Sequence, residues 1–189
     1  MLKKSIMRKI ILILLFLGLQ SCGEDTLPKP QGQLRLEYPN PVYGKLEGSC
    51  PFTFDVNNET KIKGNENCSF ELHYPKMKAT IYVTYKKVEG NVEDLLRDAQ
   101  KLTYEHAIKA DEISTQPYIN SEKKVYGMFS EVGGNAATNA QFYVTDSTKN
   151  FLVGSMYFYA KPNFDSILPA ASYVKDDIRR IMESVEWKE

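Results

Sequence analysis

Residues 125–160 decide the fold, and they read VYGMFSEVGGNAATNAQFYVTDSTKNFLVGSMYFYA. Three runs in this stretch are rich in aromatic and β-branched residues, which are enriched in strands: 125–132, 140–145 and 151–160. The connections between them contain Gly133-Gly134-Asn135 and the segment 146–150 (DSTKN), whose residue types are typical of turns. Because the connections are tight, the three runs predict an antiparallel meander.

A helix is predicted on each side of this meander in the sequence. Upstream, residues 92–106 change to the i, i+3, i+4, i+7 spacing of one helical face, and Asn91 precedes them as a candidate cap. Downstream, a second helix is predicted from about Asp165 to Glu186, with Pro169 in its first turn, where a missing N–H is tolerated. Its apolar stripe comprises Ala171, Val174, Ile178, Ile181, Met182 and Val185, and Trp187 is expected to pack on the sheet edge.

Shorter strands are predicted before the first helix. Alternating apolar residues indicate strands at 34–38 and 52–56, and the runs 70–74 and 79–85 indicate a hairpin around Pro75-Lys76. The polar segment 57–67 is predicted to be a loop. The order of strands, helix, three strands and helix predicts one α+β domain over 34–189. In it a mostly antiparallel sheet of meander and hairpins is covered by two amphipathic helices.

Residues 1–21 have the pattern of a secretory signal. Basic residues precede an apolar run at 10–19 that is about half the ~20 residues needed to span a bilayer. The sequence Leu19-Gln20-Ser21-Cys22 resembles a lipobox, whereas an ordinary signal peptidase prefers a small residue in place of Leu19. Cys22 is therefore predicted to become the lipid-carrying N-terminus. A plain secretory signal with an incidental cysteine is the alternative.

The mature chain would begin with a tether at 22–33, since this segment is polar and rich in Pro and Gly. The first 21 residues carry four basic residues and no acidic ones, so the mature chain has 20 basic and 24 acidic residues. A net charge near −4 excludes the basic footprint expected of a nucleic-acid-binding protein. It also leaves no polybasic patch for anionic lipid.

Two cysteines, Cys50 and Cys68, remain after Cys22. An even pair in an exported chain is typical of a disulfide. The alternative is a metal site, which needs two further ligands, and His73 is the only histidine near the pair in sequence. We predict the disulfide, with neither a metal nor a cofactor apart from the covalent lipid.

No motif in the chain indicates catalysis. Gly133-Gly134-Asn135 lacks the Lys-Ser/Thr of a phosphate-binding loop and lies between strands. The acidic pairs Asp111-Glu112 and Asp176-Asp177 are sequence neighbours whose side chains point apart, so neither predicts an acid/base dyad. His106 lies on or beside the apolar helix face, where a packed side chain is the alternative to a catalytic base. The residues therefore predict a non-enzymatic domain.

Several ordered blocks nevertheless carry a family likeness: PKP (28–30), SCPF (49–52), YPKMKATIY (74–82), YEHAIKAD (104–111), VYG (125–127), GNAA (134–137), QFYVTDSTK (141–149) and EWK (186–188). This ordered set, spread over nearly the whole mature chain, resembles the gliding motility lipoprotein GldD family. The resemblance implies a cell-envelope component required for gliding motility in bacteria that use the type IX secretion system. It implies no enzymatic activity.

The resemblance also implies partners and a location. The partners would be other gliding motility lipoproteins and type IX secretion components. The location would be the outer membrane, facing the periplasm, with surface exposure as the alternative. A scaffold or assembly factor is the function we expect, and a small-ligand or envelope-polymer binding lipoprotein that uses the aromatic sheet face is the alternative. Two of the blocks contain candidate interaction residues, which could equally define turns and a helix end: His106, Lys109, Asp111, Asn135, Asp146 and Lys149.

The lipid on Cys22 is directly testable. Cys22→Ala removes the thiol to which the lipid would be attached, so metabolic labelling with a radioactive fatty acid should fall to background. Labelling at the level of the unaltered protein would contradict the assignment.

Overall fold

The computed structural model describes residues 38–64, 67–105, 112–133, 138–159 and 164–188, all within a compact unit from Gln33 to Glu189. The predicted signal, Cys22, the tether and residues 34–37 lie outside these ranges. Within these ranges, no helix is both long and apolar enough to cross a membrane.

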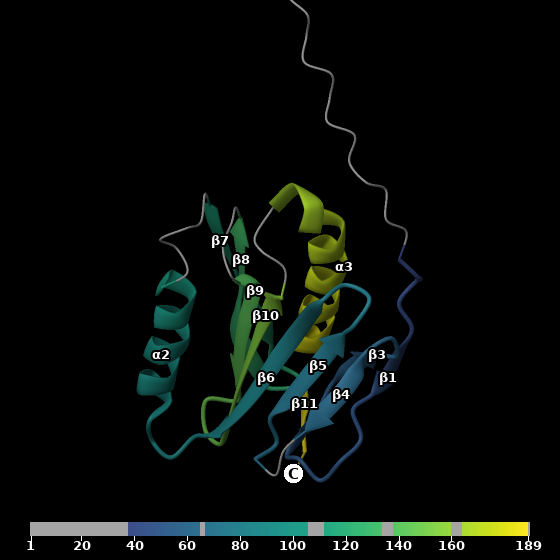
Figure 1. Ribbon diagram of the computed structural model, residues 1–189. Helices are drawn as coiled ribbons and strands as arrows, with labels where there is room; N and C mark the ends of the chain where they lie inside the picture. The colour runs from purple at the N-terminus through teal and green to yellow at the C-terminus, as the bar shows by residue number, and fades with distance from the viewer. Residues whose placement is uncertain (1–37, 65–66, 106–111, 134–137, 160–163, 189) are drawn as a thin grey trace, which may run out of the picture. The chain divides into compact units, whose positions relative to one another are not determined.

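A seven-stranded antiparallel sheet forms the centre of the domain, in the order β4-β5-β6-β10-β9-β8-β7 (Figure 1). The predicted meander is confirmed, because β8, β9 and β10 pair in succession, and β10 also pairs with β6 of the predicted hairpin. The predicted α+β class is therefore confirmed as well. The strands are β4 (Lys61–Gly64), β5 (Phe70–Tyr74), β6 (Ala79–Lys87), β7 (Glu112–Asn120), β8 (Val125–Gly133), β9 (Thr138–Thr145) and β10 (Asn150–Phe158).

Two helices, α2 (Val92–Glu105) and α3 (Phe164–Glu183), cover opposite faces of this sheet (Figure 1). On β10, Leu152 belongs to the buried cluster that includes α3, whereas its neighbour Phe151 packs with Leu95 and Ala99 of α2. Successive residues of a strand point to opposite faces, so the two helices must lie on different sides. The predicted apolar stripe of α3 is buried at every position.

Two small two-stranded sheets complete the fold, and the second of them brings the N-terminal and C-terminal parts of the domain together. β1 (Tyr43–Lys45) pairs with β3 (Asp55–Asn57), and β2 (Phe52–Thr53) pairs with β11 (Glu186–Trp187). The predicted strand at 52–56 is thus split between two partners. The predicted extension of the second helix to Glu186 is wrong, because the helix ends at Glu183 and the chain then pairs with β2. The Trp187 ring packs edge-on against Phe52, with ring centroids 6.5 Å apart.

Besides β11, three strands were not predicted from the sequence. β7 contains Pro117 and mostly exposed residues, which suit the edge of a sheet, where a missing N–H breaks no ladder bond. β4 forms the other edge, and all four of its residues are exposed, so the predicted loop at 57–67 is wrong there. β1 is only three residues long and lacks an apolar alternation.

Two local predictions about the helix starts also need correction. Pro169 is the sixth residue of α3 and therefore lies in its second turn. The Asn91 side chain accepts a hydrogen bond from the Glu89 N–H at 2.9 Å, so it turns away from α2, while its carbonyl oxygen accepts from the N–H of Leu95.

The close approach of β8 to β9 requires glycine at one position. A Cβ on Gly127 would lie 1.9 Å from the Tyr143 carbonyl oxygen, whereas a Cβ on Gly133 of the same strand would meet nothing closer than 3.7 Å. Gly127→Ala should therefore lower the free energy of unfolding by about 1–3 kcal/mol, because a backbone atom must move. Gly133→Ala should be neutral or slightly stabilising. Equal effects of the two substitutions in urea unfolding would refute this account of Gly127.

Candidate interaction surface

The structure describes two of the six residues predicted to form a shared surface. The Asp146 carboxylate closes the β9–β10 turn: its Oδ1 accepts hydrogen bonds from the N–H groups of Thr148, Lys149 and Asn150 at 2.7–2.9 Å. Burial would raise the pKa of Asp146, but these donors hold it below its usual value. The Lys149 carbonyl oxygen accepts from the Val88 N–H at 2.8 Å.

These contacts give Asp146 a structural role in the turn, and they hold the segment before α2 against it. A partner role for Lys149 stays a prediction. The other four predicted residues, His106, Lys109, Asp111 and Asn135, lie outside the described ranges.

Cys50 and Cys68, for which the sequence predicts a bridge, are joined by a disulfide with their Cα atoms 5.6 Å apart. The bridge links the segment before β2 to the β4–β5 connection. Both nitrogens of His73 are engaged elsewhere, with Thr80 Oγ1 at 2.9 Å and Glu71 Oε2 at 3.0 Å. The described part of the chain contains no group of three or more side chains placed to hold a metal ion.

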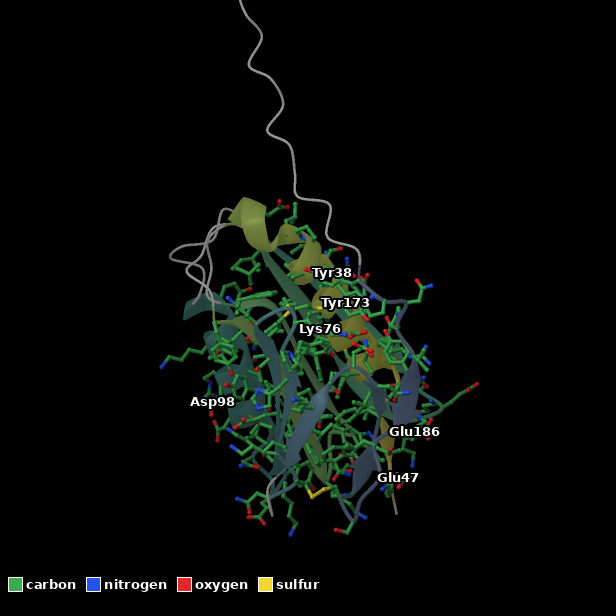
Figure 2. The ribbon with its side chains drawn as sticks, turned by 45° about the vertical axis from the view of Figure 1, so that its right-hand side comes forward. Tyr38, Glu47, Lys76, Asp98, Tyr173 and Glu186 are labelled. Atoms are coloured by element: carbon green, nitrogen blue, oxygen red, sulfur yellow. A yellow bond between two sulfur atoms is a disulfide. The ribbon has the colours of Figure 1, made fainter. Side chains whose placement is uncertain are left out.

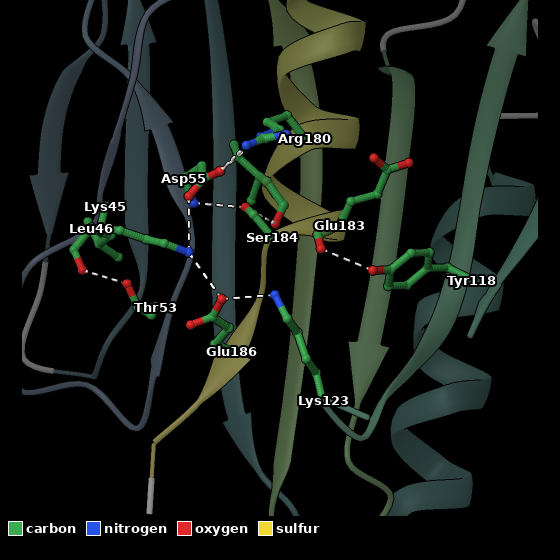
Figure 3. Close-up of polar contacts among 11 residues, drawn as sticks. Lys45, Leu46, Thr53, Asp55, Tyr118, Lys123, Arg180, Glu183, Ser184 and Glu186 are labelled. Carbon is green, nitrogen blue, oxygen red and sulfur yellow. Dashed lines mark hydrogen bonds and ion pairs between the residues drawn. The ribbon is translucent and has the colours of Figure 1, made fainter. Parts of the chain in front are cut away.

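The most elaborate polar arrangement lies where the C-terminal end of α3 meets β1, β3 and the β7–β8 hairpin (Figure 3). It surrounds a surface hollow of about 540 Å³. We call this feature the charged hollow, and its lining residues are Lys45, Asp55, Tyr118, Lys123, Arg180, Glu183, Ser184 and Glu186.

Asp55 is the central anion of the charged hollow. Its side chain is only 11% exposed and contacts Lys45 Nζ at 3.1 Å and Arg180 at 2.9 Å (Nε) and 2.6 Å (Nη2). Burial would raise the pKa of Asp55, but the two cations hold it below its usual value. The Asp55 N–H also donates to Ser184 Oγ at 2.8 Å. β3 is thereby fixed to the end of α3.

Glu186 extends the network to the β7–β8 turn. Its carboxylate accepts from Lys123 at 2.8 Å and from Lys45 at 3.3 Å, and these two hydrogen bonds lower its pKa. Across the hollow, the Tyr118 hydroxyl donates to the Glu183 carbonyl oxygen at 3.0 Å. Exposed ion pairs each contribute only about 0–1 kcal/mol, so the network positions charges more than it stabilises the fold.

The charged hollow also contains a hydroxyl group that is engaged within the domain. Ser184 donates to the Ile181 carbonyl oxygen at 3.2 Å and accepts from the Asp55 N–H at 2.8 Å. Tyr and Arg, by contrast, are enriched at protein interfaces, and the hollow presents Tyr118 and Arg180.

A buried polar cluster lies one turn of α3 behind the hollow. Asp177 is 1% exposed and accepts hydrogen bonds from the Tyr43 hydroxyl and from Asn57 Nδ2, the latter at 2.7 Å. The buried Tyr74 hydroxyl interacts with the same carboxylate without the geometry of a full hydrogen bond. Burial raises the pKa of Asp177, and the hydrogen bonds only partly offset this.

The cluster continues to the first described residue. Asn57 Nδ2 also donates to the Tyr173 hydroxyl at 3.0 Å, and the Tyr173 ring packs against the Tyr38 ring with centroids 5.4 Å apart (Figure 2). The signal for this cluster was present in the sequence, because Asp177 follows Val174 at the i+3 position of the apolar stripe. The adjacency of Asp176 and Asp177, by contrast, gives no indication that Asp177 is buried.

Comparison with known proteins gives one family. Residues 23–187 match the family described as "Gliding motility lipoprotein GldD". No curated protein matches the chain. Among solved structures, the solution structure of cyanobacterial PsbP (CyanoP) from Synechocystis sp. PCC 6803 is similar with a TM-score of 0.45 and 9% identity, over 90% of this chain and 99% of that chain. No function is carried over from a similarity of this size.

The buried Asp177 predicts a specific pH dependence. A carboxyl whose pKa is raised by folding favours the folded state while protonated, and this contribution is lost as pH rises through the raised pKa. Asp177→Asn cannot ionise, so its stability relative to the unaltered protein, measured by urea unfolding, should rise as the pH increases above about 4. A stability difference that stays constant with pH would contradict the assignment.

Proposed function

The chain belongs to the gliding motility lipoprotein GldD family, and we propose that it works as a non-enzymatic scaffold or assembly factor at the outer membrane. The lipid on Cys22 holds it there, with the domain in the periplasm. Its partners are other motility lipoproteins and components of the type IX secretion machinery. Family membership supports the role in gliding. The identity of the partners and the attachment to the outer membrane are our proposal.

The charged hollow is the observation that carries this proposal. It gathers three cations and three anions from segments far apart in the sequence, and ion pairs position all of them except Glu183. Such a pattern of opposite charges favours one orientation of a complementary surface and disfavours others. Because the Lys123–Glu186 pair is exposed, a partner can exchange its own charges with these two residues at little desolvation cost.

The edge of the sheet supports the same proposal. β7 is the last strand of the seven-stranded sheet and pairs with β8 alone among the described strands. An edge strand presents unpaired backbone groups to which another chain can add a strand. Tyr118 lies on β7 and also lines the hollow, so the edge and the charged hollow form one continuous candidate surface.

Exchanging the charges of Lys123 and Glu186 distinguishes a role of this ion pair in partner binding from a role in folding. Lys123→Glu or Glu186→Lys alone breaks the 2.8 Å ion pair, and each should reduce both gliding and the cross-linking of envelope partners. The double exchange Lys123→Glu/Glu186→Lys restores this pair with inverted charge, while the contact between position 186 and Lys45 at 3.3 Å becomes repulsive. Because both contacts are exposed, the stability should stay within about 1 kcal/mol of that of the unaltered protein, without recovery of gliding.

The Lys76–Glu59 pair, at 2.9 Å elsewhere on the surface, is the matched control. Its double exchange should leave gliding and cross-linking unchanged. Normal gliding with the inverted Lys123–Glu186 pair would show that the charged hollow is not the partner surface.

A further inference from the structure

A second surface lies on the opposite face of the sheet, beside α2. There β6 and β10 form the floor of a hollow of about 530 Å³, with Leu102 of α2 on one wall. A neighbouring hollow of about 420 Å³ shares Tyr82 and Thr84 and continues over β5 to β4. We call the two together the tyrosine groove, because Tyr82, Tyr157 and Tyr159 line it.

The three tyrosines are held in relation to one another. The Tyr82 and Tyr157 rings meet edge to face, with centroids 5.6 Å apart and planes at 78°. The hydroxyls of Tyr82 and Tyr159 are hydrogen-bonded at 2.9 Å. Tyr159 nevertheless remains 61% exposed, so a large aromatic surface is available to solvent at a restrained position. Little side-chain entropy is left to lose when a ligand packs on it.

The chemistry of the lining narrows the class of ligand. The exposed Thr84 side chain places a hydroxyl among the aromatic rings, whereas Ser155 is buried in the floor of the groove. At the far end Glu71 contacts both Lys63 and His73, at 3.8 Å and 3.0 Å, so the groove presents no uncompensated charge. A ligand that fits must be neutral and must carry both apolar faces and hydrogen-bonding groups.

Other occupants fit less well. An acyl chain would cover the exposed Thr84 hydroxyl without offering it a hydrogen-bond partner, which costs free energy. A peptide that adds a strand at the edge strand β4 would not reach the tyrosines, because β5 lies between β4 and β6. A pyranose ring, by contrast, has a C–H face that packs on the electron-rich face of an aromatic ring, and hydroxyls around its rim.

We propose that the tyrosine groove binds a neutral glycan chain of hexopyranose or N-acetylhexosamine units. One sugar packs on the exposed Tyr159 ring, and its hydroxyls reach Thr84 and the tyrosine hydroxyls. The groove lies on the α2 face and the charged hollow on the α3 side of the sheet, so glycan and protein partner can be bound together. The inference does not depend on the scaffold role.

The test uses the full-length lipoprotein in detergent micelles and isothermal titration with chitohexaose and maltohexaose. At least one of the two should bind. Tyr159→Ala and Tyr82→Ala should each weaken the affinity by up to about tenfold, the loss expected for one aromatic contact. Tyr82→Phe keeps the ring and loses only the hydroxyl pair, so it should weaken binding less than Tyr82→Ala.

Tyr104→Ala is the matched control, because Tyr104 is also 61% exposed but lies outside the groove. Its affinity should equal that of the unaltered protein. Circular dichroism of each variant excludes a loss of fold. The proposal is overturned by the absence of binding at millimolar glycan, by equal effects of Tyr159→Ala and Tyr104→Ala, or by saturation of the groove with palmitate in place of glycan. Tyr159→Ala should still cross-link partners, so failure here leaves the scaffold proposal standing.

Discussion

The burial of one face of α3 against the seven-stranded sheet is the constraint on which the rest of the domain depends. Val174, Ile178 and Ile181 are almost completely buried there, together with residues of β5, β6, β8, β9 and β10. Each such side chain contributes about 1.5–3 kcal/mol relative to exposure. Because this contact fixes the position of α3, it also fixes the polar side chains that lie at the edge of the buried face of the helix.

These polar side chains attach the N-terminal strands β1 and β3 to α3. Asp177 binds Tyr43 of β1 and Asn57 of β3, and Arg180, three residues later and so on the same side of the helix, binds Asp55. The small β1–β3 sheet is therefore held to α3 by a buried carboxylate at one level and by a partly exposed ion pair at the next. The charged hollow exists because the second level lies at the surface, where the helix ends and β11 begins.

The sequence predicted the parts of this arrangement that depend on local periodicity. The meander, the hairpin and the buried stripe of α3 follow from repeats of two and 3.6 residues. β7, β4 and β1 could not be predicted in this way, because edge and accessory strands bury too little to show an alternation. The polar contacts could not be predicted either, because their partners are far apart in the sequence. Asp55 and Arg180, for example, are separated by 125 positions. Only Asp177 left a local signal, its place within an apolar stripe.

Both proposed surfaces are built from individually weak contacts, and this suits a protein attached to a membrane. An exposed ion pair contributes at most about 1 kcal/mol and an aromatic contact about 0.5–1.5 kcal/mol, too little for tight binding from dilute solution. Under the proposed attachment through Cys22, a first contact makes the next one intramolecular, which can raise the overall affinity by a factor of about 10²–10⁴. The charged hollow and the tyrosine groove can then both be occupied, although each binds its own ligand only weakly. Weak contacts also dissociate quickly, so an assembly factor of this kind can be released when its partners rearrange.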